Sequence, residues 1–250
     1  MQEPLLQVRG LCKNYGALKV TDDVSLDVMP GQIHAVIGPN GAGKTTLIAQ
    51  LSGQIRPDAG QVICAGRDIT ALDMAARVRL GLARSFQLTT LLPRFTVLEN
   101  VALAVQAREG SSFRFFRPAA AEAALNDEAM DYLGDVGLAD RARRAAGTLS
   151  HGEKRQLELA VALATRPRLL LLDEPLAGTG HEEAAQLIEL FAALRSRVTM
   201  MLIEHDMDAV FRLADQVSVL VYGRIVATGD PAQVRADPGV RAAYLGEEEV

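Results

Sequence analysis

The order of apolar and polar positions along the chain predicts an α/β protein. Strands are expected across residues 5 to 37, where apolar and polar side chains alternate over residues 24 to 28. A short apolar run at residues 34 to 37 then follows a Pro-Gly turn. Two later runs, the four leucines before Asp173 and residues 198 to 203, are almost wholly apolar, which is typical of parallel strands buried on both faces.

Helical spacing appears around these runs. From about residue 70 to residue 165 the pattern is mainly helical and rich in alanine. A further helix is expected over residues 182 to 195, with apolar side chains on one face at Leu187, Leu190, Phe191 and Leu194. Residues 217 to 221 and 224 to 228 flank Tyr222-Gly223 and predict a hairpin. The pattern therefore indicates an α/β core interrupted by a helical insertion.

The strand at residues 34 to 37 leads into Gly38-Pro-Asn-Gly-Ala-Gly-Lys44-Thr45, which matches G-x-x-x-x-G-K-[ST]. Gly38, Gly41 and Gly43 allow backbone angles that turn successive amides toward phosphate oxygens. Lys44 supplies a positive charge for the β- and γ-phosphates, and Thr45 a hydroxyl for Mg²⁺. A glycine-rich turn with a chance Lys-Thr pair is the alternative, but it leaves the preceding strand unexplained. The loop therefore predicts a nucleoside triphosphate as ligand.

Asp173 and Glu174 close the apolar strand of four leucines. In a protein with a phosphate-binding loop, an acid at such a strand end can hold Mg²⁺ through water. A neighbouring carboxylate can polarise the attacking water. Two acids at the end of a surface strand are the ordinary alternative, which the four leucines disfavour. The pair is expected to carry hydrolytic chemistry.

Composition narrows the remaining possibilities. The 250 residues are 49% hydrophobic with a formal net charge of -5, and no Lys- and Arg-rich run offers the footprint of a nucleic-acid partner. Cys12 and Cys64 stand far apart, without the spacing of a metal or redox motif. No window reaches the roughly 18 apolar residues of a membrane helix, and the first residues lack the pattern of a signal peptide. Work at a membrane would therefore require other chains that span it.

Ser150 and Glu153 have the spacing of a capping box, which alone explains both residues. They lie in the segment Leu149-Ser-His-Gly-Glu153, one predicted helix before Asp173. Together with the phosphate-binding loop and the Asp-Glu strand, this segment resembles the LSGGQ motif of the ATPase subunits of ATP-binding-cassette (ABC) transporters. Here the motif reads LSHGE, with His151 for the first glycine and Glu153 for the glutamine.

The resemblance spans residues 8 to 246 and implies roles for further residues. Gln87 matches a glutamine that touches Mg²⁺ and water and senses the membrane subunit, and His205 matches the switch histidine at the γ-phosphate. Tyr15 matches the aromatic that stacks on adenine, although a core or edge aromatic is an alternative. The implied site comprises catalytic Glu174, His205, Gln87 and Lys44; ATP-binding Tyr15, Gly38, Pro39, Asn40, Gly41, Ala42, Gly43, Lys44, Thr45 and Thr46; Mg²⁺-binding Thr45, Gln87 and Asp173; and, for the other ATP site of a dimer, Leu149, Ser150, His151, Gly152 and Glu153.

The same resemblance implies an architecture. The fold class is α/β: a P-loop NTPase core with a mainly parallel sheet, an N-terminal antiparallel β subdomain and an inserted α-helical subdomain. One ABC ATPase domain is expected over residues 1–250. Its RecA-like core and β subdomain would occupy about 1–86 and 166–250, and its helical subdomain about 88–165.

The resemblance also implies cofactors and partners. ATP and Mg²⁺ are the implied cofactors. The implied partners are a second ABC ATPase chain, in a homo- or heterodimer, transmembrane permease subunits and, indirectly, a solute-binding protein, with no nucleic acid. The implied location is peripheral, at the cytoplasmic face of the inner (plasma) membrane.

One loop departs from the family pattern. After the Asp-Glu pair the family usually reads Ser-Ala-Leu-Asp, whereas this chain has Leu176-Ala-Gly-Thr-Gly180, with glycine in place of the aspartate. The departure puts communication between two ATP sites through this loop in question. The segment 111–117 holds three Phe and two Arg, and packing on the helical insertion, docking of the membrane partner and lipid contact stay open for it.

The kind of transporter is a finer inference. Four features resemble the ATPases of importers for branched-chain or other hydrophobic amino acids or amides. They are Glu204-His-Asp-Met-Asp208, the Ala-Gly after Pro175-Leu176, the long stretch between Gln87 and Ser150, and the ending 240–246. Lipopolysaccharide-export ATPases share a similar ending but are shorter in the middle. A soluble non-transport ABC ATPase is the third possibility, but it would need long coiled coils or a basic surface, and neither is visible.

Overall fold

The structure is a computed structural model that describes residues 3–85, 91–110 and 123–240. Gln87, the Phe-rich segment 111–117 and residues 241–246 of the ending therefore lie outside the described residues. All other predicted site residues lie within them.

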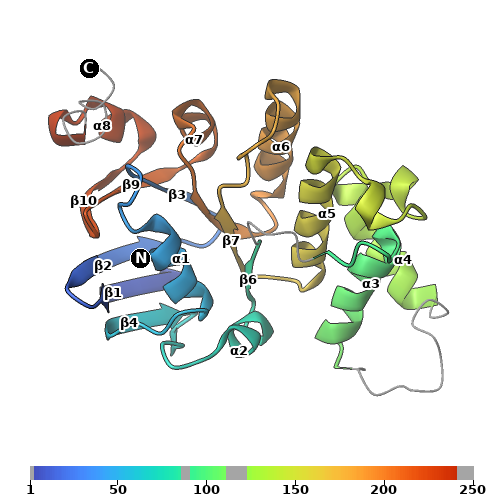
Figure 1. Ribbon diagram of the computed structural model, residues 1–250, viewed down its shortest axis with the longest axis horizontal. Coiled ribbons are helices and arrows are strands. Elements are labelled where there is room, and N and C mark those ends of the chain that lie inside the picture. Colours follow the sequence, from blue (N-terminus) through green and yellow to red (C-terminus); the bar gives the residue numbers. More distant parts are fainter. Residues whose placement is uncertain (1–2, 86–90, 111–122, 241–250) are drawn as a thin grey trace.

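Two sheets form the centre of the fold (Figure 1). The first is antiparallel with the order β2-β1-β4-β5, from strands β1 Leu6–Tyr15, β2 Leu18–Val28, β4 Ala59–Cys64 and β5 Arg67–Asp68. The second has the order β10-β9-β3-β8-β7-β6, from strands β3 Ile33–Ile37, β6 Leu82–Arg84, β7 Leu169–Asp173, β8 Thr199–Ile203, β9 Gln216–Val221 and β10 Arg224–Gly229. Neighbouring strands of this second sheet are parallel, except that β9 and β10 form the predicted antiparallel hairpin.

Helices cover these sheets, and α3, α4 and α5 lie together at one side of the molecule (Figure 1). The α-helices are α1 Lys44–Ser52, α2 Met74–Arg79, α3 Val97–Arg108, α4 Ala123–Asp135, α5 His151–Ala164, α6 His181–Leu194, α7 Met207–Leu213 and α8 Pro231–Ala236. Two 3₁₀ turns, η2 Ala139–Arg141 and η3 Ala146–Thr148, lead from α4 to α5. The mixed α/β fold with one antiparallel and one mainly parallel sheet is confirmed.

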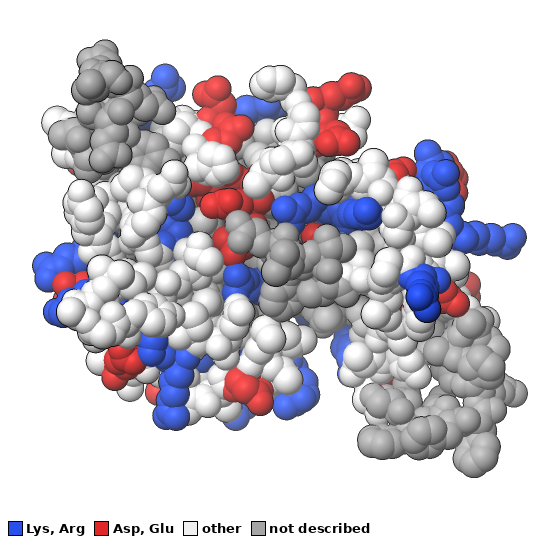
Figure 2. All heavy atoms as spheres, viewed as in Figure 1, with Lys and Arg blue, Asp and Glu red and all other residues white. Residues whose placement is uncertain are grey.

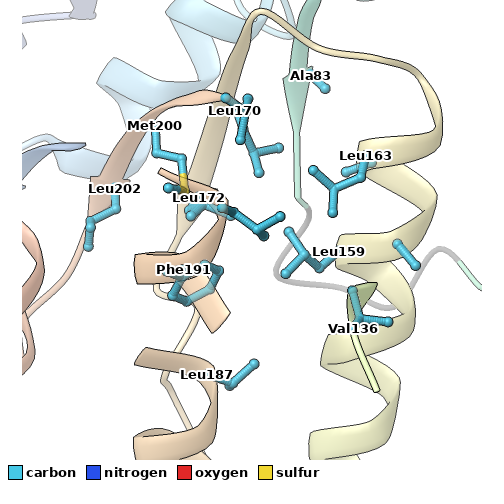
Figure 3. Close-up of a cluster of buried hydrophobic side chains, with 14 of the residues drawn as sticks. Ala83, Val136, Leu159, Leu163, Leu170, Leu172, Leu187, Phe191, Met200 and Leu202 are labelled. Carbon is cyan, nitrogen blue, oxygen red and sulfur yellow. The ribbon is translucent and has the colours of Figure 1, made fainter. Parts of the chain in front are cut away.

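Strand β7 is buried on both faces, as the four leucines predict. Leu170 and Leu172 belong to a core shared with α5 and α6, where they lie near Leu159 and Phe191 (Figure 3). Leu169 and Leu171 point to the opposite face and belong to a second core, shared with α1 and the antiparallel sheet. Burying each leucine contributes roughly 1.5 to 3 kcal/mol, so this strand ties the two cores together and fixes the position of the acids at its end.

Parallel pairing places the candidate site at one edge of the second sheet. Asp173 at the end of β7 stands opposite Ile203 at the end of β8, and β8 pairs in parallel with β3, which ends at Ile37. Because the carboxyl ends of parallel strands meet at one edge, the loops that follow these three strands converge there. They carry the phosphate-binding loop, the Asp-Glu pair and His205.

Strand β4 begins at Ala59, so Gly60 lies within a strand. Gly60 has φ of +91°, and an added Cβ would lie 2.3 Å from the carbonyl oxygen of Gly10. Glycine is therefore needed at this position because the backbone of β1 approaches closely, and not because a turn is made there.

Candidate nucleotide-binding site

The glycines of the phosphate-binding loop are required for two different reasons. Gly41 and Gly43 have φ of +78° and +104°, as the sequence predicts. At Gly38, by contrast, an added Cβ would lie 2.1 Å from the carbonyl oxygen of Leu220, so close backbone approach requires glycine there. The loop is thus pressed against β9, and Gly223 donates a hydrogen bond of 2.9 Å to the carbonyl of Ala42.

Lys44 lies at the mouth of this loop and begins α1. Its ammonium donates hydrogen bonds to the carbonyls of Gly38 at 2.6 Å and Pro39 at 3.0 Å, and the residue is 7% exposed. Burial lowers the pKa of Lys44, and the nearby carboxylates of Glu174 and Asp173 oppose that shift. The N-cap residue, Gly43, makes no side-chain cap, so the first amides of α1 are available to an anion, as phosphate sites require.

Asp173 forms a buried ion pair that the sequence analysis missed. One terminal nitrogen of Arg84 donates to its Oδ2 at 2.7 Å, and the two side chains are 7% and 1% exposed. Burial raises the pKa of Asp173, while Arg84 lowers it. The other oxygen, Oδ1, is buried and accepts no hydrogen bond from the described residues. This carboxylate therefore keeps one acceptor oxygen for a ligand.

Glu174 directly follows the strand in an unusual conformation. Its φ is +48°, in the left-handed region that non-glycine residues rarely adopt, and its amide donates to the carbonyl of Ile203 at 2.9 Å. Such strain persists where surrounding structure enforces it, and it is frequent at functional sites. The strand pairing with β8 thus fixes the direction in which the Glu174 side chain leaves β7.

His205 lies two residues beyond the end of β8, with a side chain that is 58% exposed. Its amide donates to Oε2 of the preceding Glu204 at 3.1 Å, and its Nδ1 lies 3.8 Å from the same oxygen. Glu204 itself is 1% exposed, and the sequence analysis assigned it no separate role. The structure therefore brings an accessible imidazole, Lys44, Asp173 and Glu174 to one sheet edge.

Tyr15, at the end of β1, is 50% exposed, which does not fit a core aromatic. The ammonium of Lys13 lies 5.8 Å from the centre of its ring. Lys13 is held in turn by Asp58 at 2.7 Å. One aromatic surface therefore remains accessible to a planar ligand such as adenine.

Replacing Tyr15 by Ala is expected to weaken binding of ATP and ADP by about 1 to 2 kcal/mol, because the stacking surface is lost. Tyr15→Phe keeps the ring and should bind both nucleotides as the wild type does. Titration with a fluorescent ATP analogue measures the difference. Equal affinity of the Ala variant and the wild type would make Tyr15 an ordinary edge aromatic.

The LSHGE segment begins α5 with the predicted capping box. Ser150 Oγ accepts from the amide of Glu153 at 3.2 Å, and Glu153 Oε2 accepts from the amide of Ser150 at 2.9 Å. Glu153 Oε1 also accepts from Arg141 Nε at 3.1 Å, and these contacts, the Ser150 amide first, lower the pKa of Glu153. Arg141 therefore provides the charge compensation for Glu153.

The LSHGE segment and the phosphate-binding loop line different cavities. A cavity of about 70 Å³ at the start of α5 is lined by Ser150 and by residues of α5 and α6, and none of the phosphate-binding loop lines it. Gly152 packs closely here, because an added Cβ would lie 2.8 Å from a carboxylate oxygen of Glu183. Among the described residues, the LSHGE segment thus faces a different space from Lys44.

This geometry defines a nucleotide-binding P-loop protein, and comparisons with known proteins give its family. The family profile of the ABC transporter matches residues 21–177. A second profile, described as a branched-chain amino acid ATP-binding cassette transporter, matches residues 224–250. The chain therefore belongs to the ABC transporter family, as one of its ATP-hydrolysing, ATP-binding proteins.

Curated relatives match along the whole chain. The high-affinity branched-chain amino acid transport ATP-binding protein LivG of Escherichia coli is 38% identical, over 99% of this chain and 100% of its own. BraF of Pseudomonas aeruginosa, which carries the same description, is 40% identical over the same shares. The lipopolysaccharide export system ATP-binding protein LptB of Haemophilus influenzae is 33% identical over 98% of both chains.

Solved structures of ABC cassettes have the same fold. A nucleotide-free ATP-binding cassette from an ABC transporter superposes with a TM-score of 0.85 at 31% identity, over 96% of this chain and 98% of its own. The ADP conformation of another cassette gives 0.86 at 30% identity, over 98% and 100%. Among residues 3–85, 91–110 and 123–240, no helix has both the length and the apolar character needed to cross a membrane.

Proposed function

We propose that this chain is the ATP-binding and hydrolysing subunit that powers an importer of branched-chain or other hydrophobic amino acids or amides. The similarity to LivG and BraF, 38% and 40% over 99% of the chain, carries the proposal. The match of residues 224–250 to the branched-chain profile supports it independently. An exporter of the lipopolysaccharide type is supported less, by a relative at 33% identity.

The site residues fit Mg²⁺-ATP as the substrate. Lys44, now bonded to two carbonyls of its own loop, can turn to the β- and γ-phosphates beside the amides of α1. The buried Oδ1 of Asp173 lacks a donor among the described residues, which suits a water bound to Mg²⁺. Mg²⁺, when bound with Thr45 and Gln87 as further ligands, supplies positive charge that neutralises the phosphates.

Hydrolysis requires a base and a residue that holds the transferred phosphate. Glu174 would accept the proton of the attacking water, because it leaves β7 next to Asp173 in a fixed direction. His205 would donate to the γ-phosphate from the neighbouring strand end, where its ring is exposed. Each residue performs a step that the geometry of the sheet edge permits.

A second chain would complete each ATP site. The cavities of about 70 and 460 Å³ at the start of α5 include no residue of the P-loop of the same chain. The LSHGE segment of a partner would therefore meet the γ-phosphate. Ser150 and Gly152 would supply the positive helix end there. The Arg141–Glu153 ion pair reduces the negative charge that opposes this contact. Acidic and basic side chains also lie next to one another on the face shown in Figure 2.

The membrane partner would dock on a cavity of about 450 Å³ that lies between α2, β6, α3 and α5. Its lining is largely apolar, with Val78, Leu92 and Leu103 among its residues, and it includes Arg84, the partner of Asp173. An apolar segment of a permease subunit suits this lining. The chain would then sit peripherally at the cytoplasmic face of the inner membrane, beneath the permease and its solute-binding protein.

Solute uptake tests the transport function. Loss of the gene in the native host should abolish high-affinity uptake of labelled leucine and leave uptake of labelled glutamate unchanged. The wild-type gene should restore leucine uptake, and Glu174→Gln should not. Unchanged leucine uptake in the deletion strain, with ATPase activity present in the purified chain, would show that the chain serves another transporter.

Association should depend on nucleotide. The Glu174→Gln variant with ATP and Mg²⁺ is expected to dimerise, because each ATP joins two chains, whereas the nucleotide-free chain should remain largely monomeric. The attraction of a helix end for phosphate is only about 0.3 to 2 kcal/mol, so we expect the homodimer to be weak. The working pair would then be either a homodimer supported by permease subunits or a heterodimer with a sister ATPase. Light scattering over a concentration series measures this. A tight dimer without nucleotide, or no dimer with ATP and permease, would contradict the two-chain site.

A further inference from the structure

We propose that Glu204 is a positioning residue that holds the loop after Glu174 and the backbone of His205 in one fixed arrangement. The inference rests on the proposed roles of Glu174 and His205. In this role Glu204 acts through its neighbours, by accepting hydrogen bonds from backbone amides.

Glu204 lies where two parallel strands end. Strand pairing holds β7 and β8 together up to Asp173 and Ile203, and the amide of Glu174 adds one more bond, to the carbonyl of Ile203 at 2.9 Å. Beyond this point the side chain of Glu204 makes hydrogen bonds to both of the loops that follow the strands. Its Oε1 accepts from the amide of Leu176 at 2.9 Å, and its Oε2 accepts from the amide of His205 at 3.1 Å. One carboxylate therefore joins the two loops.

Burial shows that the carboxylate is not there for packing alone. Glu204 is 1% exposed, and among the described residues no Lys or Arg forms an ion pair with it; the nearest such contact is the imidazole of His205, at 3.8 Å. Burial raises the pKa of Glu204, and the amides of Leu176, His205 and Asp206 oppose that shift. A buried carboxylate costs several kcal/mol unless its oxygens are hydrogen-bonded. An apolar side chain would fill this place without that cost but would bind neither amide.

The loop that follows Glu174 depends on this bond. Thr179 donates two hydrogen bonds to the carbonyl of Leu176, one from its amide at 3.3 Å and one from its hydroxyl at 2.8 Å. Gly178 and Gly180 have no neighbour within 4 Å of an added Cβ, so side-chain packing does not hold the loop at these two positions. The amide of Ala177 also donates to the carbonyl of Glu174, at 3.1 Å. Both bonds of Thr179 thus end on Leu176, the residue whose amide donates to Glu204.

This arrangement also faces open space. A cavity of about 420 Å³ is lined by residues 176–181, Ala184, Glu204, His205 and Asp206. The carboxylate that joins the amides of Leu176 and His205 therefore lies at this cavity, between the loop after Glu174 and the exposed imidazole.

Glu204→Gln tests the inference with almost no change in volume. The amide keeps one acceptor oxygen but places an NH₂ group opposite one of the two backbone N–H groups, so one of the two bonds is lost. We expect kcat to fall about 10- to 100-fold, as the loss of one hydrogen bond to a charged acceptor predicts. ATP affinity should stay within about twofold, because the phosphates are held by the loop 38–46.

The matched control is Glu189→Gln, the same substitution at a side chain on α6 that is 75% exposed. It should retain the wild-type kcat. A kcat of Glu204→Gln within threefold of wild type would overturn the inference. So would a joint loss of kcat, ATP affinity and melting temperature, since that pattern marks a residue needed only for folding. Full turnover by Glu174→Gln, read from a separate variant, would instead contradict the proposed role of Glu174, on which the inference rests.

Discussion

Replacing Glu174 by Gln is expected to lower ATP turnover by about 10²- to 10⁴-fold, the usual contribution of a general base. Glutamine preserves size and can keep most hydrogen bonds, but it cannot accept the proton of the attacking water. ATP affinity should be almost unchanged, because Lys44 and the amides of α1 bind the phosphates. The backbone of Glu174 is fixed by its bond to Ile203, so the substitution should not redirect the loop.

Phosphate release under single-turnover conditions and ATP titration measure the two quantities separately. Glu182→Gln is the control, because that side chain is exposed in the first turn of α6. Its turnover should equal that of the wild type. Hydrolysis by Glu174→Gln within twofold of wild type would assign the base to another residue.

The parts of the site that could be predicted from the sequence are those that short segments encode. The phosphate-binding loop needs glycine, lysine and threonine at fixed spacing, and the strand before it is apolar. The capping box at Ser150 and the four leucines before Asp173 are equally local. Parallel strands also have a common polarity, so their carboxyl-end loops could be expected at one edge.

The parts that could not be predicted depend on side chains that meet across the fold. Arg84 and Asp173 are 89 positions apart, and Glu204 binds the amide of a residue 28 positions before it. Nothing in the sequence near either residue reports its burial or its partner. Arg84 offered one weak signal, since it stands three residues before the predicted Gln87. Gly38 was interpreted through backbone freedom, although its reason is the nearby carbonyl of Leu220.

These long-range contacts suggest how the site is held together. Arg84 on β6 forms an ion pair with Asp173, and Ile203 on β8 accepts a hydrogen bond from the amide of Glu174. Glu204, the residue after β8, accepts one from the amide of Leu176. Residues that carry the chemistry are thus oriented by neighbouring strands of the same sheet. A reaction that needs water, base and phosphate within about 3 to 3.5 Å benefits from such fixed geometry.

Lys44→Ala is expected to act on binding, in contrast to Glu174→Gln. Lys44 is 7% exposed, and its ammonium donates to the carbonyls of Gly38 and Pro39, so it is oriented before a phosphate arrives. Hydrogen bonds to charged groups contribute about 1.5 to 3 kcal/mol each. Losing two of them to the β- and γ-phosphates corresponds to about 3 kcal/mol, or roughly 100-fold in ATP affinity.

Calorimetric titration of Lys44→Ala with ATP and ADP measures this loss, and Arg212→Ala is the control. Arg212 also carries one positive charge, but its side chain is 57% exposed and pairs with Glu189 on α6, so its removal should leave affinity unchanged. We further expect Lys44→Ala to lose less affinity for ADP than for ATP, because ADP has no γ-phosphate to contact. Equal ATP affinity in the variant and the wild type would show that the loop amides bind the phosphates without Lys44.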